Sequence, residues 1–312
     1  MSISMNSIFS SGWEDIKKNP ILFVPNILLF IFSTILLFAI GIVFFIFFSD
    51  SLDVLINSSS EFLVNSDFDL LMNSWSDFFW AFLPVGIIYV FIYILLTAYV
   101  QAGLIGMSYD VAKTGDTQFS RMFFYGNKYL FRSLFASILV SLIILLPLFL
   151  FALLFGIGFL LPSDVFLLLF IFLAVLMFPF FLFYLIYLII FSLYLYFVLY
   201  AVVIDDLSAI AGIRKSIALF KANIGDVIIF WLIIMAISIA VGMIASLFSY
   251  LGIIPVIGFI FSILYFLLQI FISIFLTAIV TVWGTRMYLE LTEKTDGCND
   301  CINSDESNKM SF

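Results

Sequence analysis

Residues 200–226 read YAVVIDDLSAIAGIRKSIALFKANIGD. A long apolar run ends at Ile204, and two carboxylates, Asp205 and Asp206, follow it directly. The next residues alternate between apolar and polar with the period of a helix, until an Asn-Ile-Gly break precedes another apolar run. This arrangement predicts a short amphipathic helix that lies on a membrane surface between two membrane spans.

The composition of the chain indicates an integral membrane protein. Of its 312 residues, 65% are hydrophobic and 10% are charged, and the mean hydropathy is +1.29. An ordinary soluble domain is roughly 45–50% apolar and about 25% charged. The chain contains no histidine, so the commonest metal ligand and the commonest general base near neutral pH are missing.

Six apolar segments are long enough to cross a bilayer as helices, which predicts an all-α integral membrane protein. The expected spans are residues 20–48, 78–107, 134–161, 165–204, 227–250 and 259–283. All 12 Lys and Arg residues fall in the N-terminus, the tail and two connections on one side, whereas the other connections carry 7 of the 20 acids and no Lys or Arg. The positive-inside rule makes the first side cytosolic, so both termini are expected in the cytosol.

The fourth expected span is unusually long. No charge occurs from Val165 to Ile204, and a helix of that length would extend about 60 Å across a hydrocarbon core of about 30 Å. Pro179 lies inside this run and can kink a helix. We expect one bent helix that projects past the headgroups; the alternative is a re-entrant hairpin followed by a separate span.

The layout repeats three times along the chain. Asn19, Asn127 and Asn223 each follow a short amphipathic stretch and each precede an apolar span. We therefore predict three hairpins, each preceded by a short cytosolic amphipathic helix, because such a unit buries too little surface alone and packs against its neighbours. The expected units are residues 6–107, 108–204 and 205–291 of a six-span membrane domain at 1–291, followed by a disordered polar tail at 292–312.

The helix in the opening stretch has predicted caps at both ends. Asp205 or Asp206 can cap its N-terminus, where a negative charge also suits the helix dipole. Gly225 can end the helix in a left-handed conformation. The apolar stripe on the predicted helix consists of Ile210, Ile213, Ile217 and Phe220.

Basic and aromatic residues beside the spans are expected to contact anionic lipid headgroups, because Lys, Arg and Trp favour that layer. The predicted contacts are Trp13, Lys17, Lys18, Arg121, Lys128, Arg132, Arg214, Lys215 and Lys221. A second pattern is the spacing of Ser238, Gly242 and Ser246, which places three small residues on one helix face. Such a stripe allows close packing of helices, within the chain or in a dimer.

The residues needed for catalysis are not found in the spans. No ionisable side chain other than tyrosine occurs inside any of the predicted spans, although pumps and proton-coupled carriers usually need one. Cys298 and Cys301 form a lone CxxC pair in the tail and are a weak metal candidate, because a structural zinc site needs four ligands. We predict no catalytic residues, no cofactor and no enzymatic activity.

Residues 201–231 resemble a known family. The matching residues are Val202-Val203-Ile204-Asp205-Asp206, Gly212-Ile213-Arg214-Lys215-Ser216, Leu219-Phe220-Lys221-Ala222-Asn223 and Trp231. The pattern is similar to the multi-pass membrane domain of some glycerophosphodiester phosphodiesterases and to YciC-like, stand-alone prokaryotic membrane proteins of unknown function. The resemblance implies six spans and an accessory role in the membrane. The soluble phosphodiesterase domain has no counterpart here, so that activity does not carry over.

These observations predict a non-enzymatic protein of the plasma membrane that organises or senses the membrane or supports a partner. The alternative is a transporter or export component for a lipid or a small apolar solute. The expected partners are membrane lipids and either another membrane protein or a second copy of the chain, with no nucleic acid. Low arginine use with abundant Phe, Ile, Asn and Ser suggests a prokaryotic source.

Overall fold

The computed structural model describes residues 4–65, 68–158, 163–251 and 257–309, and this part of the chain is helical with no strand. The elements are α1 Met5–Lys18, the 3-10 turn η1 Pro20–Phe23, α2 Val24–Asn65, α3 Phe68–Thr114, α4 Phe119–Gly158, α5 Ser163–Leu195, α6 Val198–Ile204, α7 Ala209–Ala222, α8 Ile224–Leu251 and α9 Ile257–Lys309. Six helical segments are long and apolar enough to cross a membrane: Pro20–Val43, Leu83–Thr114, Phe119–Leu154, Val175–Ile204, Ile224–Leu247 and Gly258–Thr295. The predicted number of spans is therefore confirmed, and the chain has the character of a multi-pass membrane protein.

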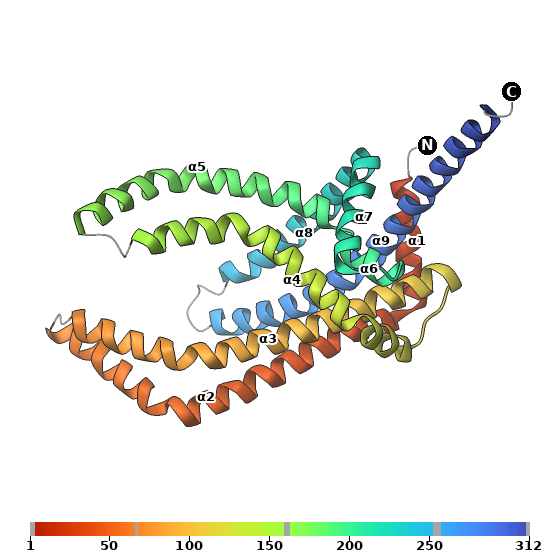
Figure 1. Cartoon of the computed structure of the whole chain (residues 1–312). Coiled ribbons are helices and arrows are strands. Elements are labelled where there is room, and N and C mark those ends of the chain that lie inside the picture. The colour runs from red at the N-terminus through yellow and green to blue at the C-terminus, as the bar shows by residue number, and fades with distance from the viewer. Residues whose placement is uncertain (1–3, 66–67, 159–162, 252–256, 310–312) are drawn as a thin grey trace.

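Consecutive long helices pack against each other: α2 against α3, α4 against α5, and α8 against α9. Figure 1 shows that these pairs converge where the short helices α1, α6 and α7 lie and spread apart at the opposite end. We call the part built from α1, α6, α7 and the adjoining turns of the long helices the packed end. The packed end is therefore where the three helix pairs come closest to one another.

The side chains most completely enclosed by protein lie at the packed end. Ile8 of α1, Phe230 of α8 and Tyr288 of α9 are fully buried in one cluster. Toward the other end, large apolar side chains stay exposed, such as Phe149 at 63% and Phe178 at 70%. A surface of this kind suits lipid hydrocarbon rather than water. Side chains thus pack on one another at one end, and large apolar side chains stay exposed toward the other end.

The fourth span continues as one helix through Pro179 and is interrupted further along the chain. α5 runs through Pro179 to Leu195, and a turn at residues 196–197 separates it from α6. The hydroxyl of Ser216, which is fully buried on α7, donates to the Tyr194 carbonyl at 2.7 Å and accepts from the Phe197 N–H at 3.2 Å. One side chain therefore satisfies a carbonyl and an N–H at the turn.

Glycines let α3 and α4 cross at close range. A Cβ atom at Gly106 of α3 would overlap the ring of Tyr125 on α4. The converse contact lies nearby, since a Cβ atom at Gly126 of α4 would lie 2.8 Å from the ring of Tyr99 on α3. Each helix thus offers a glycine to the tyrosine of the other, which fixes the crossing at the packed end.

Helices extend further than the sequence indicated. α2 continues to Asn65 and α3 begins at Phe68, so most of the connection expected at 49–77 is helical; this segment contains neither Gly nor Pro to interrupt a helix. α9 continues to Lys309, into the segment expected as a polar tail. The domain boundary at 291 stays a prediction, and the side chains of Cys298 and Cys301 lie outside the described residues.

Replacing Ser216 with alanine should destabilise the fold by about 1–3 kcal/mol, because a buried N–H and carbonyl would lose their shared partner. Unfolding of the purified protein in detergent micelles, followed by circular dichroism, measures this loss. Ser238→Ala is the matched control, since its hydroxyl is exposed and donates only to the Ile234 carbonyl of its own helix. Equal losses in the two variants would contradict the assigned role of Ser216.

Candidate functional site

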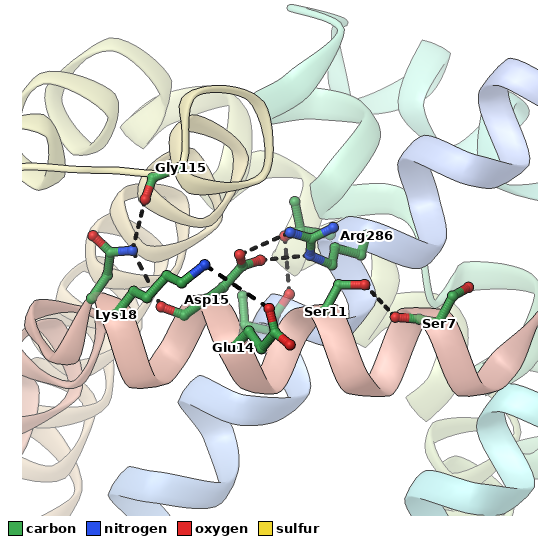
Figure 2. A network of polar contacts seen from close by, with 10 residues as sticks. Ser7, Ser11, Glu14, Asp15, Lys18, Gly115 and Arg286 are labelled. Carbon is green, nitrogen blue, oxygen red and sulfur yellow. Dashed lines mark hydrogen bonds and ion pairs between the residues drawn. The ribbon is translucent and has the colours of Figure 1, made fainter.

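An ion pair at the packed end joins the first helix to the last. Arg286 of α9 donates to Asp15 of α1 through Nε at 2.5 Å and Nη2 at 2.8 Å. Figure 2 shows the guanidinium reaching across to the carboxylate from the neighbouring helix. Only 7% of Asp15 is exposed. A two-pronged contact of this type fixes both the distance and the orientation of its partners.

Asn19 forms the C-cap of α1 and ties it to the end of α3. Its Nδ2 donates to the Asp15 carbonyl at 3.2 Å and to the Gly115 carbonyl at 3.1 Å. Gly115 directly follows α3 and has a φ of 82°, which L-amino acids other than glycine rarely adopt. The side chain of Asn19 thus links the end of α1 to the end of α3 at the packed end.

Asn223 occupies the corresponding position in the third unit. It is the C-cap of α7, and its Nδ2 donates to the carbonyl four residues earlier, Leu219, at 3.4 Å. The same amide also donates to the hydroxyl of Thr295 on α9 at 3.4 Å. Asn19 and Asn223 thus make a similar pair of contacts: one to the carbonyl four residues back, and one to the second long helix of their unit, at Gly115 just after α3 and at Thr295, the last residue of the candidate span in α9.

The second unit is built differently. α4 runs without a break from Phe119, so no separate amphipathic helix precedes the third span, and Asn127 is an exposed residue inside α4. Basic side chains close this unit instead. Lys128 contacts the Asp206 carboxylate at 3.3 Å, and Arg132 donates both to that carboxylate and to the Asp206 carbonyl, the latter at 2.9 Å. The asparagine parallel therefore holds for the first and third units and not for the second.

The other acids of the opening stretch are also engaged. Asp205 pairs with Lys215 of α7 and accepts a hydrogen bond from the Tyr288 hydroxyl. Asp226, in the first turn of α8, accepts from Lys294 of α9 at 2.7 Å. These contacts link α6, α7, α8 and α9 at the packed end.

The predicted capping of α7 is wrong in its residues. The N-cap is Ser208, whose hydroxyl accepts from the Ala211 N–H at 3.4 Å, and the two aspartates lie too early in the chain to serve. Gly225 lies within α8 and is not left-handed. Asn223 ends α7 in its place. A hydroxyl and an amide do the capping, and the carboxylates are left for ion pairs.

Asp206 has an unusual backbone conformation and a shifted acidity. Its φ of 56° is the only positive value at a non-glycine residue in the described part of the chain, and aspartate tolerates this region better than most residues. Burial opposes ionisation, but Lys128 and Arg132 outweigh it and hold the pKa of Asp206 below its ordinary value of 3.8. Asp206 is therefore a carboxylate that two cations of α4 keep ionised.

The predicted headgroup residues divide into two groups. Five cations contact acids of the chain itself: Arg121 lies 3.4 Å from Asp110, Lys128, Arg132 and Lys215 make the pairs described above, and Lys18 is the fifth. Lys18 lies at 3.9 Å from the exposed Glu14. Lys17, Arg214 and Lys221 have no ion pair among the residues that the structure describes, and Trp13 beside Lys17 is 45% exposed. Contact of either group with lipid stays a prediction.

The amphipathic helix α7 packs on protein with a face that overlaps the predicted stripe only in part: Phe220 is buried, and Ile213 is partly buried against a core cluster. Its buried residues are Ala209, Gly212, Ser216, Leu219 and Phe220, whereas Ile210 is 54% exposed. A Cβ atom at Gly212 would lie 2.9 Å from Val202 of α6. Small residues thus let α7 lie close on α6, and part of the predicted apolar stripe is left facing outward.

A cavity of about 450 Å³ lies between α2, α3 and α9, within the segments long and apolar enough to span a membrane. Its polar lining includes Asn26 and Ser33 of α2, Thr97 and Gln101 of α3, and Gln269 and Ser273 of α9. Asn26 also donates to the Ile274 carbonyl at 3.1 Å, which joins α2 to α9. None of the residues that line this cavity was predicted from the sequence to be a site residue.

A smaller cavity of about 240 Å³ lies between α8 and α9 and shares Gln269, Ser273 and Thr277 with the first. Ser238 and Gly242 of the small-residue stripe line it. A Cβ atom at Gly242 would meet nothing within 4 Å, so the stripe does not bring another described helix into close contact. Packing of the stripe, including Ser246, in a dimer stays a prediction.

One signal in the sequence could have revealed these cavities. Polar residues recur every fourth position along α9, at Gln269, Ser273, Thr277, Thr281 and Thr285. Three of their hydroxyls donate to the carbonyl four residues earlier: Thr277, Thr281 and Thr285. A spacing of four residues keeps side chains near one face of a helix. The expected span 259–283 therefore carried a polar stripe as well as an apolar surface.

Comparison with known proteins identifies one family. A family model described as a domain of unknown function, DUF7847, matches residues 3–291. No curated protein and no solved structure has a significant match. The family match covers the first five candidate spans in full and the sixth, Gly258–Thr295, up to Leu291.

Replacing each of the three asparagines with alanine should lower the free energy of unfolding by different amounts. Asn19→Ala and Asn223→Ala should each lower the free energy of unfolding by about 1 kcal/mol, because each removes two hydrogen bonds from a buried amide. Asn127→Ala should change it by less than about 0.5 kcal/mol, since that residue is exposed. Denaturant titration in micelles measures all three. A loss at Asn127 as large as at the other two would contradict the structural distinction.

Acid should remove the contribution of Asp206 to stability. Its pKa is lowered in the folded state, so the stabilisation is complete at neutral pH and is lost as the pH falls through that lowered pKa. The melting temperature of the wild type minus that of Asp206→Asn should therefore be constant above about pH 5 and shrink below it. Glu14→Gln, an exposed acid on α1, is the control and should show a smaller change. A difference that grows on acidification would contradict the assignment.

Proposed function

The chain belongs to the family defined by the domain of unknown function DUF7847, and within it we propose that this protein is a non-enzymatic membrane protein. In this proposal it organises or senses the membrane or supports a partner through its packed end. A role of this kind needs a fixed surface rather than a reactive group. The acids Asp15, Asp205, Asp206 and Asp226 are engaged with cations of the same chain, which supports a structural use of these carboxylates.

The observation that carries the proposal is a set of cations at the packed end that have no ion pair among the described residues. Lys17 of α1 lies beside the exposed Trp13, while Arg214 and Lys221 of α7 lie on the helix that exposes Ile210. An exposed apolar side chain next to a cation suits the boundary between headgroups and acyl chains. Each such cation near an anionic membrane surface contributes roughly 1 kcal/mol.

The finer topology belongs to the same proposal. We infer three hairpin units in a prokaryotic plasma membrane, with both termini and the amphipathic helices α1 and α7 in the cytosol. The one-sided distribution of Lys and Arg supports this orientation, and the matching contacts of Asn19 and Asn223 support an internal repeat. The similarity at residues 201–231 to the membrane domain of glycerophosphodiester phosphodiesterases supports an accessory role, with lipids and either a membrane protein or a second copy as partners.

A second candidate function is transport or export of a lipid or a small solute. The cavity between α2, α3 and α9 favours it, because a polar cavity within membrane-spanning segments gives a solute somewhere to bind. A bundle that only organises lipid at its surface has no need of polar side chains at that depth. The cavity shares three α9 residues with its smaller neighbour, so a polar surface extends from α2 to α8 around α9.

Removing the unpaired cations should weaken binding of anionic lipid. Native mass spectrometry of the full chain in detergent, with phosphatidylglycerol or phosphatidylcholine added, measures the preference between the two lipids. The combined variant Lys17→Gln, Arg214→Gln and Lys221→Gln should lose up to about 3 kcal/mol of the preference for phosphatidylglycerol. The fold should be retained, because these side chains are exposed or have no ion pair in the described residues.

Two comparisons make this test decisive. Glu14→Gln, which removes an exposed acid from α1, should leave the preference unchanged or raise it. The wild-type preference should also fall with added salt, as exposed charges are screened. A wild type without preference, or a triple variant that binds phosphatidylglycerol like the wild type, would refute the lipid-surface role.

A further inference from the structure

We propose that the cavity between α2, α3 and α9 binds an uncharged lipid whose head carries hydroxyl groups. The inference rests on the second candidate function and specifies its substrate class. Diacylglycerol and neutral glycolipids share the required chemistry, which is a small hydrogen-bonding head on acyl chains. The volume of about 450 Å³ falls within the range of about 300–1,000 Å³ that is typical of small-molecule sites.

Two carboxamides in the lining call for a hydrogen-bonding occupant. Gln101 of α3 and Gln269 of α9 line the cavity, and their side chains make no hydrogen bond within the part of the chain that the structure describes. In hydrocarbon, an amide without a partner costs several kcal/mol. Packing alone does not explain two such groups facing one space. A ligand that both donates and accepts hydrogen bonds does.

The lining selects against charge. None of the thirteen described residues that line the cavity is Asp, Glu, Lys or Arg. A phosphate or an ammonium group at this depth would have no opposite charge beside it and would be expensive to bury. Amide and hydroxyl groups, in contrast, can exchange hydrogen bonds with a sugar or a glycerol hydroxyl at little desolvation cost. The preferred head is therefore polar and neutral.

The rest of the lining suits the acyl chains. Leu29 and Phe30 of α2, and Phe266 and Ile270 of α9, contribute apolar surface to the same cavity. Gln269 and Ser273 are exposed side chains, so the cavity is open at the polar stripe of α9. A lipid can thus place its head against the stripe while its chains stay beside apolar side chains and the surrounding bilayer.

The test is binding of two neutral lipids to the full chain. Dioleoylglycerol and monoglucosyl-dioleoylglycerol are titrated separately into detergent-purified protein, with dioleoyl phosphatidylglycerol as the charged comparison, and bound lipid is counted by native mass spectrometry. Gln101→Leu and Gln269→Leu should each weaken binding of the neutral lipids at least tenfold without lowering the melting temperature. Gln118→Leu is the matched control, since Gln118 lies between α3 and α4, away from this cavity, and should bind like the wild type.

Each outcome has a defined reading. Tighter binding of the glucolipid supports the proposal and assigns the sugar as the head, whereas equal binding of both supports it and assigns the glycerol hydroxyl. If a leucine variant fails to fold, Thr97→Val takes its place, because it keeps the shape and removes one lining hydroxyl. Absence of neutral-lipid binding, binding unaffected by either glutamine, or equal loss of phosphatidylglycerol in the glutamine variants would overturn the inference. The surface role of Lys17, Arg214 and Lys221 would stand apart from that failure, since their own variant tests it.

Discussion

A helix cannot be interrupted near hydrocarbon unless its freed N–H and carbonyl groups find new partners. The structure depends on how this is done between α5 and α6. Ser216 supplies a donor to Tyr194 and an acceptor to Phe197, and it can do so only if α7 lies close on α6, where Gly212 makes room. The turn lets α6 run in a new direction into the core, where Phe197 and Ala201 are fully buried. One buried hydroxyl thus sets the position of two short helices.

The molecule is stabilised by different means over its length. At the packed end, buried apolar side chains, ion pairs and capped helix ends hold elements together that lie far apart in the sequence. Along the outer halves of the long helices, Phe, Leu and Ile side chains are exposed, and each helix satisfies its own backbone hydrogen bonds. The cavity between α2, α3 and α9 lies within the candidate membrane spans, where polar side chains occur inside otherwise apolar segments.

Much of the architecture was predictable, since spans depend only on local hydropathy: the six spans followed from short stretches of sequence. Contacts between distant residues were not predictable in this way. Asp15 and Arg286 are separated by 271 positions, and both resemble ordinary headgroup-layer charges. The capping prediction failed at Asp205 and Asp206 because α7 begins only at Ala209, which leaves the cap to Ser208, and both acids pair with cations instead. The cavity was missed because the four-residue polar repeat on α9 lies within a strongly apolar run.

The ion pair between Asp15 and Arg286 joins the first helix of the structure to the last. During synthesis, α1 emerges long before α9, so the Asp15 carboxylate has no Arg286 partner until nearly the whole chain has been made. Ile8 and Gly12 are likewise covered by side chains of α9, including Trp283, only once α9 has been made. The order of translation therefore places completion of the packed end last, and a chain cut short before α9 would keep an unmatched charge at its first helix.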